Sequence, residues 1–148
     1  TRREIATPSA YAESLSLFYR ILRIVIESKQ SHYVSGKART TVEKAAETVQ
    51  LSCGDPSLSV AKLAADAAMS EVHFRRLFAR SFGVSPARYI MRTRIDLAKT
   101  LMADDSRSLT DISEQCGFSS PTYFYRVFRE LTGTTPAAYR REISEHPL

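Results

Sequence analysis

Apolar residues recur every three or four positions along most of the chain, and the strict alternation that is typical of strands is nearly absent. This pattern predicts an all-α fold. The first helix is expected from about Ser9 to Lys29, where apolar side chains cover so much of the helix that it needs burial on most sides. A second helix is predicted to open at the capping-box pattern Thr40-x-x-Glu43 and to end before Gly54-Asp55-Pro56, which is the predicted domain boundary.

An internal repeat in the second half of the chain is its most informative feature. The stretch from Ser59 to Ser70 matches the stretch from Ser108 to Ser119 at an offset of 49 residues. One residue is then inserted, and the stretch from Phe74 to Tyr89 matches Phe124 to Tyr139 at an offset of 50. The same structural unit is therefore expected twice.

Each copy is predicted to be a helix-turn-helix unit, with a short helix, a tight turn and a longer helix, at about residues 59–84 and 108–134. Serines are expected to cap the longer helices and glycines to end them: Ser70, Gly83, Ser120 and Gly133. A long connecting helix should run from Ser85-Pro86 to about Ala103. Residues 56–148 are thus expected to form a domain with two such units in tandem, preceded by a two-helix segment at residues 1–55.

In a helix-turn-helix unit, one face of the second helix is anchored and the other enters the major groove of DNA. Arginine can bond to guanine, valine and threonine can touch thymine methyl groups, and arginine, tyrosine or histidine can reach phosphates. Angular spacing of about 100° per residue then selects candidate DNA-binding residues opposite or beside the anchored faces: Val72, His73, Arg75, Arg76, Arg80, Thr122, Tyr123, Arg126 and Arg129. Arg140, beyond the second of these helices, is a candidate for a contact to the DNA backbone.

The distribution of charge supports DNA more strongly than the net charge of +5, which many ordinary proteins share. Between Glu71 and Arg94, six arginines stand against one acidic residue. For any single outward arginine the alternative is that it only solvates its helix, but the pattern occurs in two copies. A connecting helix of about 18 residues would measure roughly 27 Å, close to the turn of B-DNA of about 34 Å. We therefore expect two recognition helices in successive major grooves.

The section from about Leu58 to Arg141 resembles the DNA-binding domain of the AraC/XylS family of bacterial transcription regulators. The residues that carry the resemblance most specifically are Ile112, Gly117-Phe118, Tyr123-Phe124, Arg126, Phe128, Gly133, Thr135-Pro136 and Tyr139-Arg140. The resemblance implies a cytoplasmic, nucleoid-associated protein that binds double-stranded DNA at a promoter, usually to activate transcription by RNA polymerase. It also implies groove contacts near Val72, Arg75, Arg76, Thr122, Tyr123 and Arg126.

Two positions depart from the family's pattern. Ala68 stands where a glycine is favoured, and Ser113 stands where a small apolar residue is usual. The first departure matters for the turn of the first unit, because left-handed backbone costs a residue other than glycine about 1–2 kcal/mol.

Residues 1–52 resemble, more loosely, the helical segment that links a sensor domain to the DNA-binding domain in many such regulators and takes part in dimerisation. A homodimer through residues 1–52 is therefore expected, and a helical hairpin packed against its own DNA-binding domain is the alternative. Because the first residue is Thr1 rather than Met, a sensor domain upstream is also expected.

Two other classes of protein stay open: a fragment of a DNA-repair methyltransferase, which carries a similar helix-turn-helix region, and a basic helical protein-interaction module. The enzyme is disfavoured because Cys53 and Cys116 are too few and too far apart for a zinc site, and Cys116 replaces the interior Ala67 of the first unit. The histidines form no ligand cluster: His32, His73 and His146. No catalytic residue, metal, cofactor or membrane span is expected. The salt dependence of binding would separate DNA from a protein partner.

Overall fold

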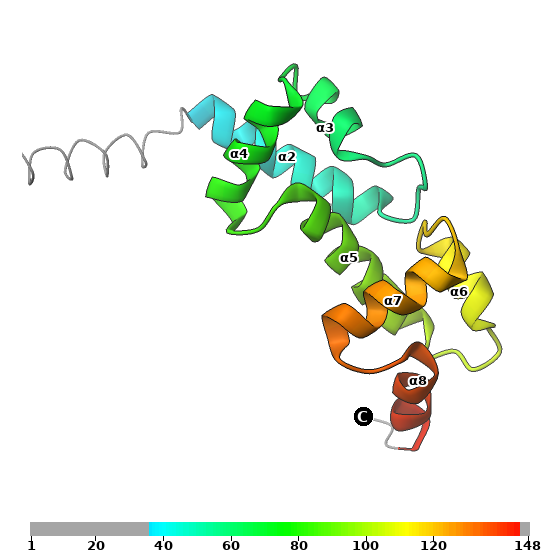
Figure 1. The fold of residues 1–148 in the computed structure, drawn as a ribbon. Helices are drawn as coiled ribbons and strands as arrows, with labels where there is room; N and C mark the ends of the chain where they lie inside the picture. The colour runs from blue at the N-terminus through cyan, green and yellow to red at the C-terminus, as the bar shows by residue number, and fades with distance from the viewer. Residues whose placement is uncertain (1–35, 146–148) are drawn as a thin grey trace, which may run out of the picture. The chain divides into compact units, whose positions relative to one another are not determined.

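The computed structural model describes residues 36–145, which are helical throughout apart from short connections (Figure 1). The helices in this part of the chain are α2 (Gly36–Ser52), α3 (Val60–Asp66), α4 (Glu71–Phe82), α5 (Pro86–Leu101), α6 (Leu109–Gln115), α7 (Pro121–Thr132) and α8 (Pro136–Glu145). This confirms the predicted all-α fold. The helix predicted at Ser9–Lys29 lies outside the described residues, as do His32 and His146.

Helix α2 begins earlier than the sequence predicts. Thr40 and Glu43 were expected to form a capping box, but the helix starts at Gly36 and both residues lie inside it. There the Glu43 carboxylate accepts a hydrogen bond of 2.9 Å from Arg39 Nε, one helical turn earlier. Such pairs four residues apart stabilise a helix across the position where the pattern suggested a start. The predicted end before Gly54 is confirmed.

The predicted start and stop signals of the two helix-turn-helix units are confirmed. The side chains of Ser70 and Ser120 accept hydrogen bonds from the backbone N–H groups three residues later, at 3.3 and 3.2 Å. Gly83 and Gly133 end α4 and α7 in left-handed conformation, with φ of 71° and 81°. Ser85 caps α5, which ends at Leu101, two residues before the predicted end.

The turn of the first unit is left-handed even though it lacks a glycine. Ala68 has a φ of 53°, and Gly117, at the equivalent place in the second unit, has a φ of 75°. Both turns therefore have left-handed backbone at this position. The first unit sustains a conformational cost of about 1–2 kcal/mol, because Cβ crowds the backbone there.

Each unit has its own apolar core. Helix α5 connects the two units and packs against both (Figure 1). In the first unit the rings of Phe74 and Phe78 are fully buried, with centroids 5.7 Å apart, and Phe78 also meets Tyr89 of α5 at 5.4 Å. In the second unit Phe124 and Phe128 are fully buried in the same way. The core of the second unit includes residues of α5, α6 and α7: Ile95, Ala98, Met102, Ile112, Cys116, Phe118, Phe124, Val127 and Phe128.

Candidate nucleic-acid interface

Helix α4 presents the predicted outward face. Phe74, Leu77 and Phe78 are buried on one side, while the candidate residues on the other sides are exposed: Val72, His73, Arg75, Arg76 and Arg80. Val72 is 78% exposed, although it is apolar. An exposed valine in the first turn of this helix is well suited to meet a thymine methyl group.

Two of the arginines on α4 are held by neighbours on the same helix. Arg75 Nε donates to the Glu71 carboxylate at 3.0 Å, and the same guanidinium forms an ion pair with it. Arg76 Nη2 lies 3.4 Å from His73 Nδ1. An exposed pair such as Arg75 and Glu71 contributes at most about 1 kcal/mol, so either arginine can turn to a DNA oxygen at low cost.

Helix α7 repeats the arrangement. Phe124, Val127 and Phe128 are buried, and the outward candidates are exposed: Thr122, Arg126 and Arg129. Tyr123 differs from them because it is half-buried. Its hydroxyl donates to Met91 Sδ at 3.7 Å, and its ring lies under the Arg126 guanidinium at 5.2 Å. Tyr123 therefore fixes Arg126 on the outward face as well as flanking it, a cation–π contact that limits the freedom of the guanidinium.

Arg140, the candidate for a backbone contact, lies in α8 and is half-buried. Its Nε and Nη2 atoms are enclosed and have no hydrogen-bond partner among the described residues. Thus these two nitrogens do not lie on the surface that would meet DNA.

Arg88, which the helical pattern does not single out as a DNA-binding candidate, lies near Arg126. A groove between α5 and α7 is lined by Ser85, Arg88 and Met91 on one side and by Tyr123 and Arg126 on the other. Arg88 is exposed at the start of the connecting helix. The signal that could have found it is its place one turn after the Ser85 cap, in the segment that joins the two units. The groove places a second cation near Arg126, and the acidic Glu130 also lines it.

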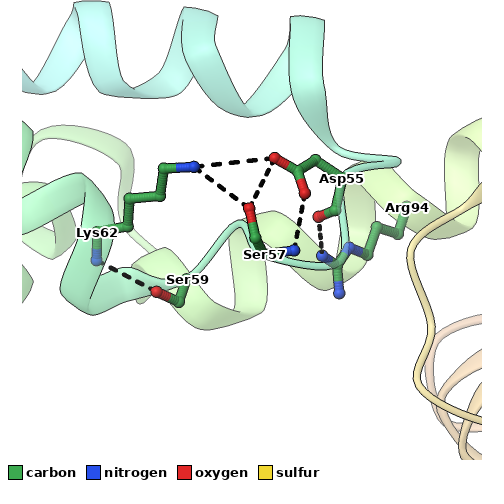
Figure 2. Close-up of polar contacts among 5 residues, drawn as sticks. All are labelled: Asp55, Ser57, Ser59, Lys62 and Arg94. Atoms are coloured by element: carbon green, nitrogen blue, oxygen red, sulfur yellow. Dashed lines mark hydrogen bonds and ion pairs between the residues drawn. The ribbon is translucent and has the colours of Figure 1, made fainter.

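Arg94, by contrast, is not available to DNA. It counts toward the basic stretch in the sequence, yet it is only 5% exposed and bonds to the backbone carbonyls of Cys53 and Asp55. Figure 2 shows the bond to Asp55. The other five arginines of that stretch are exposed: Arg75, Arg76, Arg80, Arg88 and Arg92. The basic surface is therefore one charge smaller than the sequence suggests.

Little in the described residues fits the alternative of a repair enzyme. Cys116 is fully buried, and burial raises the pKa of its thiol to about 12, so that the reactive thiolate does not form at neutral pH. Between residues 36 and 145, no three histidine, cysteine or acidic side chains lie close enough together to hold a metal ion. No helix in the same range is both long and apolar enough to cross a membrane.

Several known proteins resemble this chain. A helix-turn-helix domain family matches residues 63–142. The probable transcriptional regulator LumQ of Photobacterium leiognathi is 39% identical over 83 residues, which cover 56% of this chain and 34% of LumQ. The uncharacterized HTH-type transcriptional regulator YidL of Escherichia coli (strain K12) is 29% identical over 146 residues, 97% of this chain and 48% of YidL. The chain thus spans about a third to a half of the length of these curated relatives.

Solved structures share the fold. The DNA-binding domain of AdpA, a global transcriptional factor crystallised with a target DNA, is 28% identical with a TM-score of 0.67, over 72% of this chain and 96% of that chain. A transcriptional regulator with an AraC-type DNA-binding domain from Chromobacterium violaceum is 26% identical with a TM-score of 0.64, over 74% and 96% of the two chains. These proteins are regulators rather than enzymes, and the family match covers more than half of the chain. The chain therefore belongs to the AraC/XylS family and is a DNA-binding transcription regulator of the AraC type.

Proposed function

We propose that α4 and α7 enter successive major grooves on one face of a promoter site. The observation that carries this proposal is the repetition of one exposed, basic face on two helices that pack against the same connecting helix. Helix α5 has 16 residues, and at about 1.5 Å each they span roughly 24 Å. With the turns at both ends, this length suits recognition helices spaced by one turn of B-DNA, about 34 Å.

Base reading is assigned to the residues in the centre of each outward face. Arg76 and Arg126 would bond to guanine edges, and Val72 and Thr122 would contact thymine methyl groups. The remaining exposed or half-exposed candidates would hold the DNA backbone: His73, Arg75, Arg80, Tyr123 and Arg129. Arg140 would reach a phosphate through its third guanidinium nitrogen, Nη1, because its Nε and Nη2 are enclosed. Arg88 joins this second group, because it lies in the groove between α5 and α7 beside Arg126.

The wider role is that of a transcription activator that cooperates with RNA polymerase in the bacterial cytoplasm. The names of the relatives support regulation of transcription. The division into a segment 1–55 and a DNA-binding domain 56–148, and a homodimer through residues 1–52, belong to the same proposal. Since the relatives are longer than this chain, a sensor domain elsewhere in the protein would supply the signal.

Selection of binding sites from random duplexes tests the assignment of base reading. The wild-type chain should select two short motifs whose centres lie about one turn, roughly 10 base pairs, apart. Arg76→Ala should relax preference in one motif and Arg126→Ala in the other, each at a cost of about 1–3 kcal/mol on the cognate site. If Arg126→Ala leaves the selected sequence unchanged, Arg126 holds phosphate instead of reading bases.

A further inference from the structure

Arg94 lies in the middle of the connecting helix α5 and is buried. Its Nε donates to the Cys53 carbonyl at 2.8 Å, and its Nη2 donates to the Asp55 carbonyl at 3.0 Å. Its guanidinium also lies 5.9 Å from the ring centroid of Phe118, in the second helix-turn-helix unit. Burial lowers the pKa of this guanidinium, but an arginine remains charged in a protein. The charged guanidinium is therefore buried between the two backbone carbonyls that follow α2 and the ring of Phe118.

The two carbonyls that accept hydrogen bonds from Arg94 belong to the loop at residues 53–59, which joins α2 to α3. Asp55 fixes this loop, because its carboxylate accepts 2.8 Å bonds from both the backbone N–H and the hydroxyl of Ser57. Lys62 of α3 reaches back to the loop, with its Nζ 3.8 Å from the Asp55 carboxylate and 3.2 Å from the Ser57 hydroxyl (Figure 2). Ser59 then caps α3. The loop is thereby tied to the first helix-turn-helix unit.

The same loop touches the turn of the second unit. A Cβ atom on Gly54 would lie 2.5 Å from the Gln115 carbonyl oxygen, at the end of α6. A Cβ atom on Gly117 would lie 2.9 Å from the Gly54 carbonyl oxygen and 3.1 Å from Arg94 Nη2. The backbones of the two segments thus approach so closely that only glycine fits at both positions. Arg94 lies at this contact.

We infer that Arg94 is a positioning residue that locks the two helix-turn-helix units in the relative orientation needed for both recognition helices to bind DNA together. Arg94 links the 53–59 loop, which is tied to the first unit, with the helix between the units and with Phe118 of the second unit. The planar guanidinium suits this work because its donors point in fixed directions, whereas a lysine offers a single flexible ammonium group. The inference rests on the proposed function, in which α4 and α7 bind one site together.

A locked orientation matters because two linked modules bind more tightly than either alone. The second module then binds at a high effective concentration, and the gain reaches about 10²–10⁴-fold. If the units swing freely, much of that gain is lost, although each unit still recognises its own half-site. Loss of Arg94 should therefore weaken binding to a full site by about tenfold or more and leave binding to a single half-site unchanged.

The test uses the full chain with Arg94→Met and Arg94→Lys, with Lys99→Met on the same helix as a matched loss of charge. Residual dipolar couplings of the DNA-free protein report whether the two units keep one orientation. In the wild type and in Lys99→Met, couplings from α3–α4 and from α6–α7 should fit one alignment tensor. In both Arg94 variants they should need two different tensors, while each unit still fits its own coordinates. A single shared tensor in both Arg94 variants would overturn the inference.

Binding to DNA separates this inference from the proposed function. Fluorescence anisotropy would compare the selected full site, the same site with one half scrambled, and sites with one base pair added between the halves. The wild type should prefer the full site and the native spacing, and the Arg94 variants should lose about tenfold or more of that preference. If the wild type itself binds full and half-scrambled sites equally, the proposed function fails, and the dipolar couplings still decide the role of Arg94. If Arg94→Lys retains the full preference of the wild type, the inference fails alone.

Discussion

Removal of a single oxygen atom, in Ser113→Ala, should make the protein more stable. Ser113 is 0% exposed, and its hydroxyl oxygen has no hydrogen-bond partner among the described residues. Its carbonyl is satisfied, because it accepts from Phe118 N at 3.1 Å. A buried hydroxyl without a partner costs about 1–3 kcal/mol. The alanine keeps the backbone bond and removes only the unsatisfied group.

The internal repeat provides a matched case for this substitution. Ala64 occupies the position of the first unit that is equivalent to Ser113, and it is equally buried at 2%. Alanine is therefore compatible with this place in the fold. The lost oxygen leaves a void of about 12 Å³, which costs roughly 0.3 kcal/mol at about 24 cal/mol per Å³. We expect a net gain of about 1–2 kcal/mol in the free energy of unfolding.

Urea unfolding followed by circular dichroism measures this gain, with the slope of the transition unchanged. Ser120→Ala is a control that should instead lower the free energy of unfolding, because the Ser120 hydroxyl caps α7 by accepting a 3.2 Å hydrogen bond from Tyr123 N. Loss of that cap should cost about 1 kcal/mol. If Ser113→Ala instead loses 1 kcal/mol or more, its hydroxyl forms a hydrogen bond and the reasoning is wrong.

Three further substitutions or deletions test other parts of the account. Ala68→Gly should raise the free energy of unfolding by about 0.5–1 kcal/mol, because φ is 53° at Ala68. The same change at Ala61, which is exposed and helical, should lower the free energy of unfolding by about 1 kcal/mol. If urea titration shows a loss of stability at both positions, the backbone at Ala68 is not strained. Arg140→Ala should weaken cognate and random DNA alike and reduce the salt slope by about one ion in anisotropy titrations, and an altered sequence preference would refute a backbone role. Deletion of residues 1–35, which leaves α2 in place, should preserve site-specific binding and abolish self-association in sedimentation; a shortened chain that still dimerises would show that residues 1–35 do not form the contact.

Local signals predicted most of the fold because they act over a few residues. The caps at Ser70, Ser85 and Ser120 and the stops at Gly83 and Gly133 each bond within a single helical turn, so that their residue types suffice to place them. The start of α2 was predicted wrongly because a local capping pattern was taken as the start of the helix. The pair of Arg39 and Glu43 extends the helix across Thr40, and a capping pattern alone does not reveal such competition.

Long-range contacts account for what the sequence did not predict at the site. Arg94 lies four residues from both Ile90 and Ala98, which are buried, so the helical pattern could have placed it on the inner face of α5. Its carbonyl partners lie 39 and 41 residues away, in the loop between α2 and α3. Tyr123 likewise has the spacing of a flanking residue, but its contact with Met91 of α5 holds it half-buried. The spacing of apolar residues predicts which side of a helix a residue lies on, but it does not predict which distant residue it contacts.

In the proposed function, both recognition helices bind DNA at the same time. Hydroxyl-radical footprinting of the wild-type chain on its selected site tests this most directly, because cleavage reports which sugars the protein covers. We expect protection over about two turns, roughly 20 base pairs, confined to one face of the duplex. Protection of a single turn of about 10 base pairs would show that one helix-turn-helix unit does not bind, and would contradict the claim.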